Sequence, residues 1–99
     1  MTHRQVRVLV MGEALTDLVP AGHGSPALLP RPGGGPADVA VRLARSGVRT
    51  TFAGTVGTDA FGRQAEDRLV AAGVELDLCE RSSRPTALAV ATSSKEGTH

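Results

Sequence analysis

The sequence predicts an α/β fold in which a parallel sheet is flanked by helices and carries a separate β hairpin. Along the 99 residues, short apolar segments of strand type alternate with two amphipathic helix patterns. Strands that alternate with helices are joined by right-handed crossovers, so their sheet is parallel. An extended insertion after the first strand does not fit that layer. We expect it to stand off the sheet as a hairpin, near the carboxyl end of the first strand, where ligands bind in such folds.

The first strand is predicted over residues 6–12, because this segment is rich in valine and ends at a glycine. Residues 13–20 follow as a second, less buried extended segment. Residues 20–26 contain two prolines, two glycines and a serine, which is typical of a turn. Residues 27–29 are then expected to form a brief return strand that leads into a glycine-rich loop.

The first helix is predicted over residues 36–46. Pro36 suits its first turn, where the missing N–H has no intrahelical partner to lose. Gly47 is placed for a left-handed cap at the helix end. Four small apolar residues recur at helical spacing and predict the buried stripe, and their size lets the helix lie close to a sheet. They are Ala37, Ala40, Val41 and Ala44.

The second half of the chain predicts a strand over residues 50–56 and a helix over residues 60–72. Asp59 is placed to cap the free amides of that helix, and Gly73 to end it. Its buried side is expected to carry Phe61, Ala65, Leu69 and Ala72. Residues 74–76 are predicted to start a third core strand, and residues 86–92 to form a last strand around Leu88 and Val90.

The composition excludes several classes of function. A net charge of +1 and only two aromatic residues argue against a nucleic-acid partner, because neither an electrostatic footprint nor a stacking platform is present. Cys79 is the single cysteine, which fits a reducing cytoplasm, and the three histidines lie too far apart to suggest a metal site. No apolar run approaches the ~18 residues of a membrane span. We therefore expect a cytoplasmic protein without a membrane partner.

Residues 32–40 (PGGGPADVA) hold the strongest local signal. Three glycines let the backbone approach a neighbouring group closely, and the helix start that follows offers free amides and a weakly positive field. A small hydroxylated or anionic ligand would suit this loop, and a glycine-rich connection without a ligand is the alternative. The glycines follow neither the GxxxxGK[ST] nor the GxGxxG order, and the chain has no GxSxG elbow.

Two segments resemble the ribokinase-like (PfkB) carbohydrate kinases, especially those of fructokinase type. Residues 8–20 (VLVMGEALTDLVP) resemble the first strand of that family and the start of its lid. Residues 33–40 resemble the first family signature, which normally has Asn where Asp38 stands. Gly47 and Gly57 fall at the spacings that this signature requires.

Two further segments extend the resemblance over residues 6–97. Residues 57–62 (GTDAFG) are similar to the Gly-x-Asp-x-Phe-Gly segment of the family, and residues 85–90 are similar to the lid strand that returns over the sugar. The resemblance implies that residues 1–99 are the N-terminal third of a PfkB kinase domain with a ribokinase-like, truncated fold. The lid would comprise residues 14–31 and 86–92.

The resemblance implies an ATP- and magnesium-dependent transfer of the γ-phosphoryl group to a sugar hydroxyl. Asp17 would accept hydrogen bonds from the sugar, Gly33 and Gly34 would let the backbone approach it, and Asp38 would take the position whose side chain also meets it. By alternation, Ala89 and Ala91 would face the sugar. The substrate would be a fructose-like hexose or a keto-sugar acid, with nucleoside and sugar-phosphate kinases as alternatives within the family.

The family's catalytic base lies in a Gly-Ala-Gly-Asp-like segment that these 99 residues lack, and no nucleotide-binding loop follows. We therefore expect no catalytic, cofactor-binding or metal-binding residue in this chain, and no kinase activity from the chain alone. We also expect marginal folding or association, because a partial sheet leaves an open edge. The alternative function is a non-catalytic sugar-binding or oligomerisation remnant, with a homodimer formed through the lid hairpin.

Overall fold

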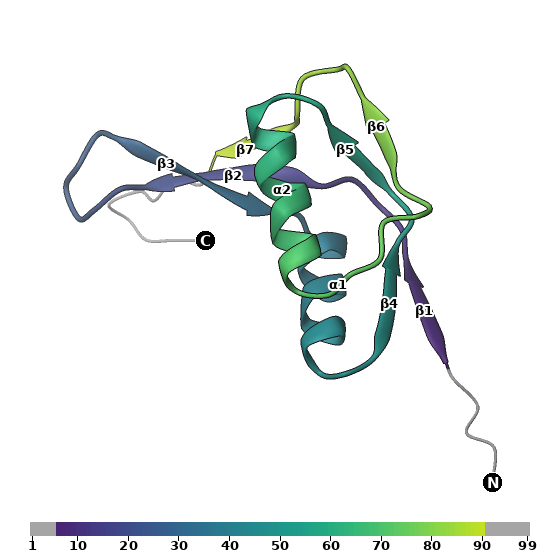
Figure 1. Ribbon diagram of the computed structural model, residues 1–99. Helices are drawn as coiled ribbons and strands as arrows, with labels where there is room; N and C mark the ends of the chain where they lie inside the picture. Colours follow the sequence, from purple (N-terminus) through teal and green to yellow (C-terminus); the bar gives the residue numbers. More distant parts are fainter. Residues whose placement is uncertain (1–5, 91–99) are drawn as a thin grey trace, which may run out of the picture.

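The computed structural model describes residues 6–90 and has the α/β architecture that the sequence predicts (Figure 1). The hairpin of strands β2 and β3 extends away from a body formed by the two helices and strands β1, β4, β5 and β6. The elements in chain order are β1 (Arg7–Val10), β2 (Leu15–Pro20), β3 (Leu28–Gly33), α1 (Gly35–Arg45), β4 (Arg49–Phe52), β5 (Thr55–Gly57), α2 (Ala60–Ala71), β6 (Glu80–Ser82) and β7 (Leu88–Val90).

The strands form parallel pairs in the body and a mixed sheet in the lid. In the body, β1 pairs with β4 and β5 pairs with β6, both in parallel. In the lid, β2 lies between β3, which is antiparallel to it, and β7, which is parallel to it. The chain thus brings β7 back beside a strand that it left about 70 residues earlier, as the family resemblance implies for residues 85–90.

The core lies between the helices and the strands of the body. Its largest fully buried side chains are those of Phe52, Leu69, Val41 and Val56. The predicted stripe of α1 is confirmed, since Ala37, Ala40 and Val41 are buried and Ala44 packs against them from a half-buried position. On α2 the buried residues are Gly62, Ala65 and Leu69, whereas Phe61 is only half-buried.

Both helix ends are confirmed at the predicted glycines. Gly47 follows α1 with φ +90°, and Gly73 follows α2 with φ +91°. A residue with a Cβ rarely adopts this left-handed conformation, so each glycine ends its helix at low cost.

The return strand of the lid is longer than predicted. It was expected over residues 27–29, yet β3 continues through two prolines to Gly33. Pro30 and Pro32 face Leu18 and Thr16 across the antiparallel ladder. Proline is tolerated there because β3 is an edge strand of the lid sheet, where alternate N–H groups point away from the neighbour. The first glycine of the glycine run therefore belongs to the lid.

The strand predicted over residues 50–56 is wrong as one element. It is divided into β4 and β5 at Gly54, where an added Cβ would lie 1.9 Å from the carbonyl oxygen of Gly12. Beyond this close approach the pairing partner changes, because the amide of Glu80 donates to the carbonyl of Gly54 and β5 continues beside β6.

The later strands also differ from the prediction. In place of a strand over residues 74–76, only Glu75 bridges to Thr51 in parallel. Strand β6 was not predicted, because its sequence Glu-Arg-Ser is polar and its side chains are mostly exposed. Strand β7 covers residues 88–90, and the rest of its predicted range, residues 91 and 92, lies outside the described residues.

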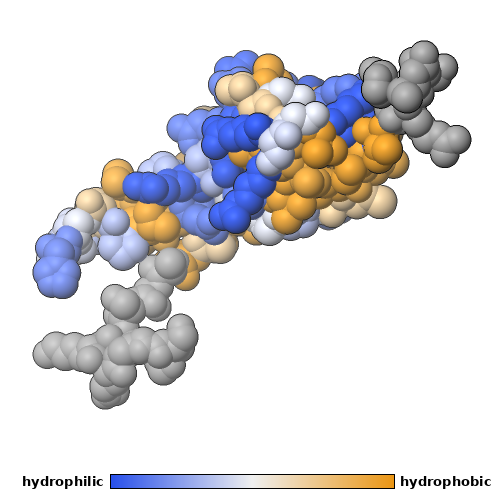
Figure 2. Space-filling view, turned by 90° about the horizontal axis from the view of Figure 1, so that it is seen from below, coloured by the Kyte–Doolittle hydropathy of each residue, from blue (hydrophilic) through white to orange (hydrophobic). Residues whose placement is uncertain are grey.

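Apolar side chains remain on the surface of the body and of the lid. Figure 2, seen from below, shows a broad apolar patch on the body, in the right half of the view. On and next to β1, Val6, Leu9 and Met11 are exposed, and within residues 6–90 this strand pairs only with β4. Neither helix in this part of the chain is long and apolar enough to cross a membrane.

Candidate functional site

The carboxylate of Asp17 lies directly over Gly33. Asp17 is half-buried in the central lid strand, where it pairs with Arg31 on one side and with Ala89 on the other. A Cβ added to Gly33 would lie 2.1 Å from Asp17 Oδ2 and 2.6 Å from its Cγ. Only glycine at position 33 therefore leaves room for this carboxylate position.

Gly34 turns the chain from the lid into α1. It has φ +99°, and an added Cβ would lie 3.0 Å from the carbonyl oxygen of Glu13, which glycine avoids. Gly34 occupies the N-cap position of α1, and no side chain caps this helix start. The first turn of α1 thus has no side-chain acceptor at its cap and forms a weakly positive, hydrogen-bonding end next to the Asp17–Gly33 pair.

Asp38 lies in the first turn of α1 and is paired with the second helix. Its Oδ1 accepts a hydrogen bond of 2.8 Å from Nη1 of Arg68, near the end of α2. Both side chains are partly exposed. The structure thus brings Asp17, Gly33 and Gly34 together and directs one oxygen of Asp38 to α2. Sequence reasoning did not find Arg68, because the pair spans 30 residues and no local pattern marks it.

Asp59 caps α2, as predicted, and also holds a distant segment. Its Oδ1 accepts from the amide of Gly62 at 2.8 Å, which is the cap. The same carboxylate accepts hydrogen bonds from the hydroxyl and the amide of Thr86. Hydrogen bonds from Thr86 hold the pKa of Asp59 below its ordinary value, because these donors favour the charged form. The hydroxyl of Thr86 has the larger effect and its amide the next.

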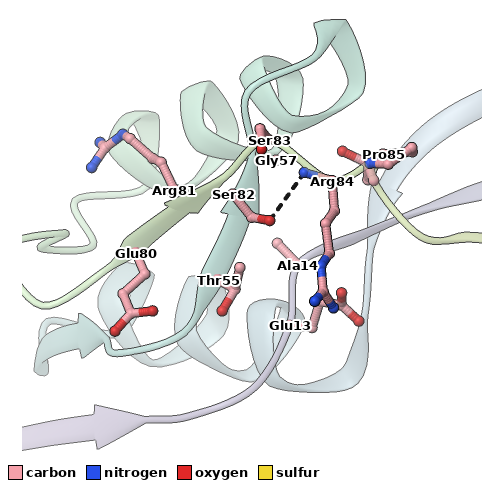
Figure 3. A pocket seen from close by; sticks show the side chains of 11 residues that line it. Glu13, Ala14, Thr55, Gly57, Glu80, Arg81, Ser82, Ser83, Arg84 and Pro85 are labelled. Carbon is pink, nitrogen blue, oxygen red and sulfur yellow. Dashed lines mark hydrogen bonds between the residues drawn. The ribbon is translucent and has the colours of Figure 1, made fainter.

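A separate cavity of about 580 Å³ lies along β5 and β6 (Figure 3). Glu13 and the segment over residues 83–86 complete its wall, and the amide of Arg84 donates to Ser82 Oγ at 3.1 Å. None of the four predicted site residues lines this cavity. Within residues 6–90, no three His, Cys, Asp or Glu side chains gather as they would to hold a metal ion.

Comparison with known proteins decides the family. The profile of the pfkB family carbohydrate kinases matches residues 5–99. The chain belongs to this family. It is 46% identical over 70 residues to the fructokinase of Escherichia coli, an alignment that covers 71% of this chain and 22% of that enzyme.

Solved sugar kinases share the fold of this PfkB chain. A fructokinase of Xylella fastidiosa with bound ATP superposes with a TM-score of 0.79 and 40% identity, over 88% of this chain and 29% of that one. A fructokinase of Vibrio cholerae in a fructose-, ADP- and calcium-bound form gives 0.77 and 34%, over 93% and 29%. The ribokinase-like fold and the fructokinase-type resemblance are thus confirmed. The chain spans between a fifth and a third of the length of these relatives.

Proposed function

We propose that this chain supplies the sugar-binding side of an ATP-dependent sugar kinase, which transfers the γ-phosphoryl group to a hydroxyl of a fructose-like hexose or a keto-sugar acid. The observation that carries the proposal is the Asp17 carboxylate held over Gly33 beside the uncapped start of α1. The family membership and the fructose-bound V. cholerae fructokinase support it.

The chemistry of this site suits a polyhydroxylated ligand. An ionised carboxylate only accepts hydrogen bonds, so Asp17 would bind sugar hydroxyls that act as donors. The amides at the start of α1 donate, so they would bind sugar oxygens that act as acceptors. Gly33 and Gly34 leave the backbone uncovered between these two groups. One pocket would thus recognise both hydrogen-bonding roles of a sugar.

Asp38 would contribute as an acceptor only. Arg68 occupies its Oδ1, which leaves the second oxygen for a sugar hydroxyl. The asparagine usual at this family position would add an amide donor. We therefore propose that Asp38 shifts the preference among sugars toward one that presents a hydroxyl donor at this point.

The lid would cover the bound sugar. Strands β2, β3 and β7 form one sheet, and Ala89 of β7 lies opposite Asp17. A closed lid excludes water and so suppresses ATP hydrolysis. In the proposed cytoplasmic enzyme, ATP would supply the phosphoryl group and Mg²⁺ would neutralise its charge. We propose that residues beyond this chain hold both, and that the chain alone does not phosphorylate sugars.

A titration of the isotope-labelled chain followed by NMR tests the sugar site. We expect fructose or 2-keto-3-deoxygluconate to shift the amide signals of Gly33, Gly34 and Asp17, and sucrose at the same concentration to shift none. In parallel, a coupled assay with MgATP is expected to detect no sugar-dependent ADP. A sugar panel that leaves these three amides unmoved contradicts the sugar site, and sugar-dependent ADP formation contradicts the inactivity of the chain.

Association through the lid is the second candidate function, and one observation favours it. The register places Leu28, Leu88 and Val90 on the same face of the lid sheet, opposite to the face of Asp17, and all three are exposed. A second copy of the chain could bury this face. We expect sedimentation velocity to show a concentration-dependent dimer that Val90→Lys weakens and Val70→Lys, on exposed α2 surface, does not. A monomer at all concentrations would exclude this role.

A further inference from the structure

The Asp59 carboxylate connects the start of α2 to the segment that enters the lid. One side chain accepts three hydrogen bonds: the amide of Gly62 caps the helix, while the amide and the hydroxyl of Thr86 come from 27 residues further along the chain. A carboxylate is suited to this because its two oxygens offer about four acceptor positions. Hydrogen bonds to a charged acceptor are also stronger than neutral ones.

The residues around the Asp59 carboxylate are closely packed. Thr86 is 8% exposed. A Cβ added to Gly57 would lie 2.4 Å from Thr86 Oγ1 and 3.1 Å from Asp59 Oδ1, so the hydroxyl occupies the space that glycine leaves. Gly62 in turn packs against the carbonyl group of Gly57. The end of β5, the start of α2 and Thr86 are therefore fitted to one another.

Thr86 is followed at once by the contacts that build the lid. The next residue, Ala87, accepts a hydrogen bond of 3.0 Å from the amide of Thr16. From there β7 runs beside β2 and places Ala89 opposite Asp17. The pairing is short, because β7 has three residues. Because Thr86 is held in place immediately before this short strand, it determines where β7 lies.

We infer that Asp59 is a positioning residue for the lid. It clamps Thr86 and so holds β7 against β2, next to Asp17, whose carboxylate is proposed to bind the sugar. The consequence for the sugar rests on the proposed function, whereas the clamp itself does not. The helix cap and the clamp use the same carboxylate, so the lid strand is tied to the rigid body of the fold through α2.

Amide hydrogen exchange of the full chain, measured by NMR without sugar, separates the clamp from the cap. The reporter is the amide of Thr16, which bonds to Ala87, and the reference is the amide of Phe52, which bonds to Glu75 in the body. Asp59→Ser keeps a hydroxyl cap for Gly62 but is too short to reach Thr86. Thr86→Val removes the hydroxyl donor and leaves Asp59 in place. Both variants are expected to speed exchange at Thr16 about tenfold, with Phe52 unchanged.

Two controls fix the interpretation. Thr86→Ser restores the hydroxyl and is expected to retain the protection of Thr16, and Asp67→Ser removes an exposed carboxylate of α2 and is expected to change nothing. Unchanged exchange at Thr16 in Asp59→Ser and Thr86→Val would overturn the clamp. Equal acceleration at Thr16 and Phe52 would also overturn it, because it indicates a purely global loss of stability. A wild-type chain that binds no sugar would refute the proposed function and leave these exchange results valid.

Discussion

Gly62→Ala is expected to destabilise the chain by about 3 kcal/mol or more, enough to unfold a small domain. The new Cβ would lie 1.8 Å from the carbonyl oxygen of Gly57 and 2.3 Å from its carbon. Both are backbone atoms at the end of β5, so no side chain can rotate away to relieve the overlap. Alanine normally stabilises a helix interior by about 1 kcal/mol relative to glycine, and here the sign is reversed.

Urea unfolding followed by circular dichroism measures this effect. Gly35→Ala is the matched control, because Gly35 also lies in the first turn of a helix and an added Cβ would meet nothing within 4 Å. We expect the control to unfold at the wild-type urea concentration or slightly above it. A Gly62→Ala chain with the wild-type midpoint would show that α2 does not pack on Gly57 as described.

The helices could be predicted from the sequence because their signals are local. The stripe of α1 repeats at helical spacing, and the glycines at 47 and 73 supply the left-handed ends that a helix needs. Strand boundaries depend on the neighbouring strand instead. The break at Gly54 results from the close approach of Gly12, a residue that is 42 positions earlier, and β6 is defined by its pairing with β5 despite its polar sequence.

In the candidate site, too, some features could be predicted from local sequence and others depend on distant residues. The glycine run and the cap formed by Asp59 could be predicted from adjacent residues. The position of the Asp17 carboxylate over Gly33 then follows from the hairpin that joins the two residues. The partners of the acidic side chains could not be predicted. Arg68 and Thr86 reach Asp38 and Asp59 only after the two helices and the lid strand have packed, and no periodicity says which basic or hydroxyl residue will arrive there.

Gly33→Ala is expected to weaken sugar binding about tenfold or more while leaving the fold intact, because a charged hydrogen-bond acceptor is displaced from the ligand. The alanine Cβ would occupy the place of the Asp17 carboxylate, which is the far end of a flexible side chain and can move. Gly33 does not have a left-handed φ, so its backbone accepts alanine. At Gly62 the added Cβ meets backbone atoms, so the substitution unfolds the chain. At Gly33 it meets a side chain, so it would change only the direction of the Asp17 carboxylate.

A double-mutant cycle tests this explanation. Sugar affinity is measured by NMR titration for Gly33→Ala, Asp17→Ala and the double variant, and urea unfolding is measured for each. If Gly33 acts by leaving room for the carboxylate, Gly33→Ala has no further effect once Asp17 is alanine, since the group that it displaces is gone. Gly22→Ala, in the turn between β2 and β3, adds a Cβ that meets no neighbouring atom and is expected to bind as the wild type does. Independent, additive losses at positions 17 and 33 would show that Gly33 serves the sugar by its own backbone approach and not through Asp17.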